Sequence, residues 1–228
     1  MEISNYTVTA GLKRPVRLVL ASDLHNRPFR HIIDVISADT PDIIIIAGDL
    51  VDRTKPSAAQ VNAVAFLEEL CGIAPVYFSF GNHEKMINAP AVFNSSNAVI
   101  LNDTAIKYRD INIGGLASAH GKKNNMPDLN FLEAFEKLDG FKILICHHPE
   151  YYPLYIRQKN IDLTLSGHVH GGQIRLFGKG IYAPAQGLFP KLTAGSYENR
   201  LFISRGLSNP VPVPRLWNDT ELCYIKII

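Results

Sequence analysis

The stretch Ser166-Gly167-His168-Val169-His170-Gly171-Gly172-Gln173 directly follows residues 161–165, an apolar run with the pattern of a buried strand. Side chains two residues apart point the same way only while the chain stays extended. The glycines on both sides of the histidines allow the backbone to bend at the end of the strand. The two imidazoles can then diverge toward two neighbouring points, which is the arrangement that two adjacent metal ions require. A His-x-His pair alone also fits a structural role, so the choice between metal binding and a structural role depends on the other residues of the chain.

The same pattern, an apolar segment followed at once by a metal-competent side chain, occurs five times along the chain. The segments are 16–21, 43–46, 75–80, 141–146 and 161–165, and each is predicted to form a strand. The side chains that follow them are Asp23 and His25, Asp49, Asn82 and His83, His147 and His148, and His168 and His170. Ligand sites in α/β folds lie at the carboxyl ends of the strands, on loops that the sheet holds in place. One such cluster could be a turn or a helix cap, but five clusters that each directly follow a predicted strand predict a shared site.

The remaining segments predict an α/β fold with additional strands. Helices are predicted over 29–38, from an N-cap at Ser57 to residue 70, from a cap at Asp128 to residue 138, and over 151–158. Short strands are predicted over 98–101, 105–108, 111–116, 201–204 and 221–228, and the glycine- and proline-rich residues 171–194 are predicted to form a long loop. A length of 228 residues suits one domain that spans 1–228.

The composition provides enough apolar residues for a substantial core, with 46% hydrophobic residues and a formal net charge of +2. A balance of 23 basic and 21 acidic residues argues against long nucleic acid as a partner, because nucleic-acid binders carry a strongly basic face or tail. The three cysteines, Cys71, Cys146 and Cys223, are widely spaced and predict neither a disulfide framework nor a thiolate metal site. This cysteine usage favours a reducing compartment.

The sequence shows no signal for export and no membrane span. Residues 1–15 are mixed and polar, unlike a signal peptide, and no apolar run approaches the roughly 20 residues that cross a bilayer. We therefore expect a cytoplasmic protein without a transmembrane anchor, while peripheral contact with a membrane and the oligomeric state stay open. Residues 188–190 and 211–217 are apolar and irregular, and they fit either a hydrophobic wall beside the site or packing against the sheet.

Five blocks of the sequence resemble the signature of the calcineurin-like metallophosphoesterases and occur in the family's order. They are Asp23-x-His25, Gly48-Asp49, Gly81-Asn82-His83-Glu84, His147 and Gly167-His168-Val169-His170. Two further stretches, Gly171-Gly172-Gln173-Ile174 and Ile203-Ser204-Arg205-Gly206-Leu207, are similar to the bacterial branch that includes YkuE and YaeI. The resemblance implies a four-layer αββα sandwich, in which two mixed β-sheets are flanked by helices. The residues by themselves indicate only the α/β fold.

The resemblance also implies a site for two divalent metal ions. It assigns Asp23, His25 and His170 to one ion, Asn82, His147 and His168 to the other, and Asp49 to both. One carboxylate can hold two ions at the roughly 3.5–4 Å spacing of two-metal hydrolases. Imidazole, carboxylate and amide ligands without a thiolate suit Mn, Fe, Zn, Co or Ni and do not select among them. The implied reaction is hydrolysis of a phosphodiester or phosphoanhydride bond, with metal-bound hydroxide as the nucleophile.

Other polar residues near these blocks have less certain roles. The resemblance assigns His83 to contact with the substrate phosphate and to protonation of the leaving oxygen, which suits a side chain that titrates near neutrality. It selects His147 over His148 as the ligand, although residue chemistry alone cannot choose between neighbours. His148, His120 and Arg205 are then candidates for substrate contacts, and each also fits a structural role. Glu84 fits either a residue that orients its neighbours or a solvated turn.

The five blocks bind a phosphate but do not specify which ester carries it. A small-molecule or lipid phosphate ester is the expected substrate. A phosphomonoesterase, or a nucleotide or nuclease-type hydrolase of the same superfamily, is the alternative enzymatic reading. A third alternative is a non-catalytic binding module in which the metal ions only stabilise the fold.

Overall fold

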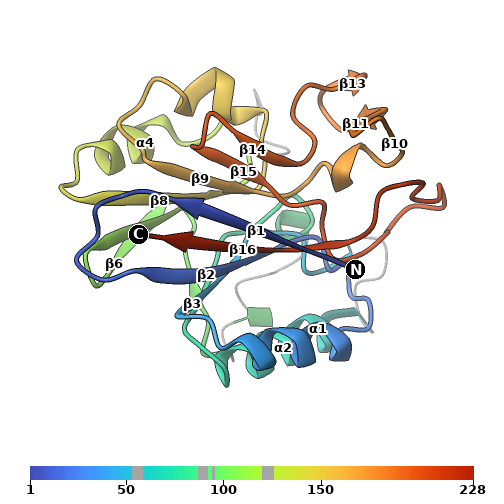
Figure 1. Ribbon diagram of the computed structural model, residues 1–228, viewed down its shortest axis with the longest axis horizontal. Helices are drawn as coiled ribbons and strands as arrows, with labels where there is room; N and C mark the ends of the chain where they lie inside the picture. The colour runs from blue at the N-terminus through green and yellow to red at the C-terminus, as the bar shows by residue number, and fades with distance from the viewer. Residues whose placement is uncertain (53–58, 87–91, 94–95, 120–125) are drawn as a thin grey trace.

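The computed structural model describes residues 1–52, 59–86, 92–93, 96–119 and 126–228 (Figure 1). The first sheet has the order β1 (Glu2–Val8), β16 (Glu221–Ile227), β2 (Val16–Ala21), β3 (Ile43–Ile46), β4 (Val76–Phe78) and β5 (Val99–Ile100). The second has the order β14 (Gly195–Tyr197), β15 (Leu201–Ile203), β9 (Leu163–Ser166), β8 (Phe141–Cys146), β7 (Ile111–Leu116) and β6 (Thr104–Tyr108). Each sheet combines parallel and antiparallel pairs, which confirms the predicted mixed sheets.

Helices cover the outer face of each sheet. The helices α1 (Arg30–Asp39) and α2 (Ala59–Cys71) lie against the first sheet, at the bottom of Figure 1. The helix α4 (Leu129–Glu136) and a short π-helix, η2 (Tyr152–Ile156), lie against the second sheet. The four layers of the αββα sandwich are therefore present as the sequence resemblance implied.

The run of four isoleucines in β3 shows how the layers are held together. Ile44 and Ile46 pack in the core between the first sheet and its helices, with Phe66 of α2. Ile43 and Ile45 point the other way and pack in the core between the two sheets, because successive side chains of a strand alternate between its faces. All four isoleucines are fully buried, which confirms the predicted strand buried on both faces.

Parallel pairing sets the position of the strand ends. In the first sheet β2, β3 and β4 run parallel to one another, and in the second sheet β7, β8 and β9 do the same. The carboxyl ends of parallel strands meet at one edge of their sheet. The loops after β2, β3, β4, β8 and β9 therefore gather together, and these are the loops that carry the predicted site residues.

The sequence missed the strands β1 and β14 and was wrong about residues 171–194. β1 pairs in parallel with β16 at the edge of the first sheet, and its side chains are mostly exposed, so it lacks the apolar pattern of an inner strand. Residues 171–194 contain two small hairpins, β10 (Arg175–Leu176) with β11 (Lys179–Gly180) and β12 (Tyr182–Ala183) with β13 (Gly187–Leu188). Two-residue strands are too short to show any periodicity. The predicted cap at Ser57 lies outside the described residues.

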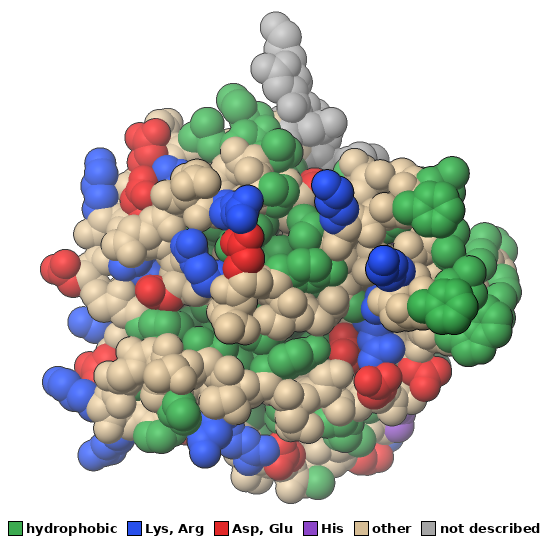
Figure 2. Space-filling model, turned by 45° about the horizontal axis from the view of Figure 1, so that its top comes forward, with side chains coloured by type: hydrophobic (Ala, Val, Ile, Leu, Met, Phe, Trp, Pro, Cys, Tyr) green, Lys and Arg blue, Asp and Glu red, His purple; other side chains and the backbone are tan. Residues whose placement is uncertain are grey.

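Hydrophobic side chains, with Lys and Arg among them, gather on the side of the molecule where the two hairpins lie (Figure 2). None of the helices in the described part of the chain combines the length and the apolar character needed to span a bilayer.

The cap at the start of α4 is a local contact that can be tested. Asp128 has an extended backbone, and its carboxylate accepts a hydrogen bond of 3.0 Å from the backbone N–H of Phe131, which confirms the predicted cap. We predict that Asp128→Ala lowers the free energy of unfolding by about 1 kcal/mol, measured by urea denaturation. Asp128→Ser should keep most of the stability because a hydroxyl can also accept this bond. Equal loss in the two variants would contradict a capping role.

Candidate metal centre

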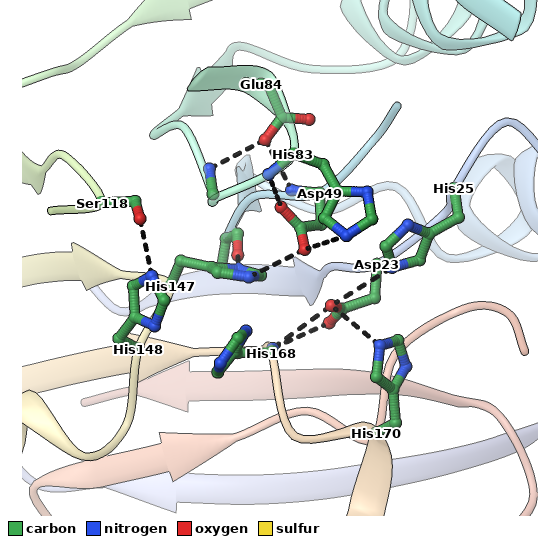
Figure 3. Close-up of polar contacts among 12 residues, drawn as sticks. Asp23, His25, Asp49, His83, Glu84, Ser118, His147, His148, His168 and His170 are labelled. Atoms are coloured by element: carbon green, nitrogen blue, oxygen red, sulfur yellow. Dashed lines mark hydrogen bonds and ion pairs between the residues drawn. The ribbon is translucent and has the colours of Figure 1, made fainter. Parts of the chain in front are cut away.

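The proposed metal ligands, together with His83 and His148, lie around one cavity of about 770 Å³ between the ends of the two sheets (Figure 3). The loops after β2, β3 and β4 contribute the residues from the first sheet, and the loops after β8 and β9 contribute those from the second. The residues that line the cavity include His25, Asp49, Asn82, His83, His148, His168 and His170. Asp23 and His147 lie beneath its wall and are fully buried.

Among the described residues, potential ligand atoms form four groups, in each of which all atoms lie within 4.8 Å of one another. The first contains Asp23, His25 and His170, the second contains Asp49, His147 and His168, and a third contains His148, Glu150 and His168. In the fourth, Asp49 is grouped with His25 and His83, so its carboxylate lies between the first two sets. The structure thus brings together six of the seven side chains that the resemblance assigned to two ions, and Asn82, the seventh, lines the same cavity. The assignment of each side chain to an ion stays a prediction.

The backbone at these positions is held in an unusual conformation. Asp23, His25, Asp49, His168 and His170 have φ angles of 57°, 48°, 55°, 72° and 47°. The left-handed region costs an L-residue roughly 1–2 kcal/mol, and such residues persist where the surrounding structure fixes them, typically at functional sites. The left-handed backbone at these five positions therefore lowers the stability of the fold, and it orients the five side chains toward the site.

Glycines allow the loops to approach one another closely enough to form the groups. A Cβ atom on Gly48, whose φ is 87°, would lie 2.6 Å from Nδ1 of His147 and 2.7 Å from the backbone nitrogen of Gly81. A Cβ atom on Gly167 would lie 2.6 Å from Oδ2 of Asp23. Both distances are too short for any side chain, so the glycines before Asp49 and His168 are required by the close approach of the two sheets.

Glu84 is the residue beneath the centre that holds the loops in place. Its carboxylate is fully buried and accepts hydrogen bonds from the backbone N–H groups of Asp49, Leu50, Val51 and Gly81, at 2.9, 2.7, 3.2 and 2.8 Å. Burial and the charge of Asp49 raise the pKa of Glu84 to about 7, whereas the four donors favour the carboxylate. Of the two roles open from the sequence, the structure shows the orienting one. Glu84 joins the loop after β3 to the loop after β4.

The charges of the buried groups suit a cation site. Burial raises the pKa of Asp49, but the surrounding imidazoles, with that of His147 first among them, together outweigh burial and hold the pKa well below its ordinary value. Burial lowers the pKa of His147, but Asp49 raises it to about 10, so the two form an ion pair of 3.1 Å. Burial lowers the pKa of His170 to about 4 and that of His168 well below its ordinary value. Ionised aspartate and neutral imidazole are the forms that bind metal ions, so Asp49, His168 and His170 are already in that form, whereas His147 has to release its proton to act as a ligand.

Several of these atoms have no hydrogen-bond partner among the described residues. They are both ring nitrogens of His25 and Oδ1 of Asn82, all buried, while Nε2 of His147 faces only the carboxylate of Asp49. Buried polar atoms are normally hydrogen-bonded, because an unpaired one costs about 1–3 kcal/mol. His25 belongs to the groups described above and Asn82 lines the same cavity, so their lack of partners fits coordination of metal ions.

The structure distinguishes His147 from His148. Nδ1 of His147 lies 2.6 Å from the backbone oxygen of Ala47, and Nε2 points toward Asp49. A hydrogen bond from one ring nitrogen to a carbonyl is the usual way of orienting a metal-binding histidine. In His148 both nitrogens are engaged, Nε2 with Ser118 at 2.6 Å and Nδ1 with Glu150 at 3.0 Å. His148 remains on the cavity wall as a residue that substrate could contact.

The remaining candidates have different surroundings. His83 lines the cavity, with Nε2 3.9 Å from Oδ2 of Asp49 and Nδ1 4.0 Å from Oδ1 of Asp52. The guanidinium of Arg205 lies 2.6 Å from Oε2 of Glu2 and 3.3 Å from Oε1 of Glu221, and it is not among the residues that line the cavity. His120 lies outside the described residues.

Sequence reasoning missed one basic residue next to the centre. One guanidinium nitrogen of Arg215 lies 3.2 Å from Nδ1 of His170. The same nitrogen donates a hydrogen bond to the backbone oxygen of Ser208. Burial lowers the pKa of Arg215 to about 10, which still leaves it charged. It belongs to the irregular segment 211–217, which the sequence offered only as a possible hydrophobic wall beside the site, and no signal in that segment singled out the basic residue.

Comparisons with known proteins agree with this geometry. The sequence model of the calcineurin-like phosphoesterase family matches residues 16–172 of this chain. An uncharacterized metallophosphoesterase of Campylobacter jejuni is 27% identical over 229 residues, which cover 95% of this chain and 60% of the relative. The uncharacterized protein YpbG of Bacillus subtilis is 30% identical over 173 residues, which cover 73% of this chain and 65% of that protein. The uncharacterized metallophosphoesterase YkuE of Bacillus subtilis is 26% identical over 211 residues, which cover 84% of this chain and 71% of that protein. The chain thus spans less than two thirds of the length of the first two relatives.

The role of Glu84 leads to a prediction about stability. Glutamine has nearly the shape of glutamate but only one acceptor oxygen, so Glu84→Gln leaves some of the four N–H groups without a partner. We expect a loss of about 2–4 kcal/mol in the free energy of unfolding, measured by denaturant titration. Glu133→Gln, which changes an exposed glutamate on α4, is the matched control and should change stability little. If the two variants were equally stable, Glu84 would not support the loops.

Proposed function

The chain belongs to the calcineurin-like phosphoesterase family, and we propose that it is a two-metal phosphoesterase that hydrolyses phosphodiester or phosphoanhydride bonds. The observation that supports this most directly is the position of Asp49 between two groups of potential ligands, together with the buried ring nitrogens of His25, which have no hydrogen-bond partner among the described residues. Asp23, His25 and His170 would hold one divalent ion, and Asn82, His147 and His168 the other, with Asp49 in contact with both.

The ligand set defines what the ions contribute. When bound, two divalent ions supply Lewis acidity toward the phosphoryl oxygens and a water that ionises near neutral pH. Asp23 and Asp49 neutralise only part of the positive charge of two such ions, so the centre attracts an anionic phosphate ester. Imidazole, carboxylate and amide donors suit Mn, Fe, Zn, Co or Ni alike.

His83 is the protein group proposed to transfer a proton. Its side chain is 17% exposed and faces the cavity, whereas the proposed ligand His147 is fully buried. The backbone N–H of His83 donates a hydrogen bond of 2.9 Å to Oδ1 of Asp49, which ties the loop to the centre. An imidazole placed there can donate a proton to the oxygen that leaves as the phosphate ester breaks. The substrate would be a small-molecule or lipid phosphate ester, with His148 on the cavity wall as a further contact.

The proposed reaction can be tested with two aryl esters. After treatment with chelator, activity on a bis-aryl phosphodiester should disappear and should return when Mn²⁺ is added. Asp49→Asn should lower activity by about 100-fold or more, since residues that only orient metal ligands already contribute about 10–100-fold. Asp34→Asn, at an exposed position on α1, is the control and should leave activity unchanged. Full activity of the metal-free protein would contradict the two-metal proposal.

The same assay separates the alternatives. Faster hydrolysis of the diester supports a phosphodiesterase, whereas hydrolysis of only the matching aryl monoester would favour the phosphatase alternative. If neither ester is hydrolysed although Mn²⁺ raises the melting temperature of the wild type and not of Asp49→Asn, the binding-module alternative gains support.

The role of His83 predicts a dependence on the leaving group. In His83→Ala the rate should fall by about 10²–10⁴-fold for an alkyl ester, whose leaving oxygen needs a proton. The loss should be much smaller for a nitrophenyl ester, whose leaving oxygen is stable without one. Metal-induced stabilisation should be retained, because His83 is not a proposed ligand. An equal loss on both esters would contradict the general-acid role.

A further inference from the structure

One side of the molecule exposes a cluster of hydrophobic side chains (Figure 2). Of the sixteen large hydrophobic residues that are exposed in the described part of the chain, nine belong to the stretch 176–217. We call this surface the lip, and its members are Leu176, Phe177, Tyr182, Leu188, Phe189, Val211, Val213, Leu216 and Trp217. Single exposed apolar side chains are common, but a cluster of this kind marks an interaction surface.

Hydrogen bonds between its parts show that the lip is one surface. The backbone N–H of Arg175 in the first hairpin donates to the backbone oxygen of Leu216 at 3.0 Å. Tyr182 and Leu188 are paired across the second hairpin. The side chain of Gln173 donates to the backbone oxygen of Val213, which connects the segment 211–217 to the start of the hairpins.

Three aromatic side chains project from the lip in a way that core packing does not explain. Phe177, Phe189 and Trp217 are 103%, 76% and 76% exposed. Each has a positive φ angle, 49°, 52° and 52°, which is rare for a bulky residue. The fold thus keeps three aromatic rings in water on backbone positions that such residues normally avoid. Both features are expected where the rings have a binding role.

The charge of the same segment is strongly asymmetric. Between Gly171 and Trp217 there are six basic residues, Arg175, Lys179, Lys191, Arg200, Arg205 and Arg215, and one acidic residue, Glu198. The side chains of Lys179 and Lys191 are exposed, while the guanidinium of Arg205 is paired with acidic residues. The whole chain has a net charge of only +2, so the basic excess of this segment is a local feature.

The lip adjoins the metal centre directly. A cavity of about 310 Å³ lies between them, and its lining includes His170 together with Tyr182, Val211 and Val213 of the lip. Val211 also lines the larger cavity that contains the metal centre. Whatever covers the lip therefore lies at the mouth of the site.

We propose that the lip docks on an anionic lipid bilayer, with Phe177, Phe189 and Trp217 in the interfacial region and Lys179 and Lys191 against the lipid phosphates. Aromatic rings favour the membrane interface, and basic side chains are attracted to anionic lipid surfaces. A second copy of this chain is a poorer occupant, because a twofold contact would place the two basic segments against each other. The inference goes beyond the proposed hydrolysis and does not require turnover.

The test uses Trp217, which is the single tryptophan of the chain and therefore a direct reporter. Vesicles of phosphatidylcholine alone are compared with vesicles containing phosphatidylglycerol, in the presence of chelator so that no hydrolysis occurs. The protein should sediment with the anionic vesicles. The emission of Trp217 should shift to the blue, and brominated lipids should quench it.

Variants locate the contact. Phe177→Ser combined with Phe189→Ser should weaken binding to anionic vesicles by about tenfold or more, and each of Lys179→Gln and Lys191→Gln by about fivefold. The control combines Ile106→Ser and Leu138→Ser, which change exposed apolar residues outside the lip, and it should bind like the wild type. Hydrolysis of the soluble aryl ester by each variant confirms that it is folded and tests the proposed function separately.

Three results would overturn the proposal. The first is the absence of sedimentation and of any change in Trp217 emission with anionic vesicles. The second is equal loss of binding in the lip variants and in the control. The third is a Trp217 shift that depends on protein concentration and not on lipid, which would assign the lip to contact between copies of this chain.

Discussion

Two carboxyl groups, those of Asp49 and Glu84, are buried next to each other at the base of the site, and the rest of the centre depends on how their charge is balanced. Glu84 is balanced by backbone N–H groups, which fix the two loops after β3 and β4. Asp49 is balanced by imidazoles from both sheets and by one backbone N–H. The carboxylate of Glu84 thus supports the loops, and the carboxylate of Asp49 faces the proposed metal site. Their different partners explain why adjacent acidic groups have different roles.

The same centre joins the two sheets. His147 extends from the end of β8 in the second sheet to Asp49 and Ala47 in the first. The backbone N–H of His168 donates to Asp23 across the same boundary. Apolar side chains fill the space between the sheets and would tolerate small shifts, but these polar contacts have fixed directions. The glycines in the loops allow the backbones to approach closely, and the left-handed residues orient the side chains for these polar contacts.

The sequence predicted the inner strands and the grouping of site residues because both leave a local mark. A buried strand such as Ile43–Ile46 is continuously apolar, and a polar residue at its end is visible at once. The edge strand β1 and the hairpins after β9 lack that mark, because their side chains are largely exposed or their strands have only two residues. Arg215 was missed for another reason. Its contact with His170 depends on how an irregular segment folds back over the chain, and no periodic pattern encodes this.

The position of the family match along the chain separates two parts of the molecule. The match covers residues 16–172, which contain every proposed metal ligand, and it ends where the lip begins. The proposed metal ligands therefore all lie within the family match, while the segment that follows it carries the lip. Because His170 is the last proposed ligand and also lines the apolar cavity beside the lip, the two parts meet at one residue. A change in the lip can then alter the surroundings of the proposed centre while the proposed ligands remain the same.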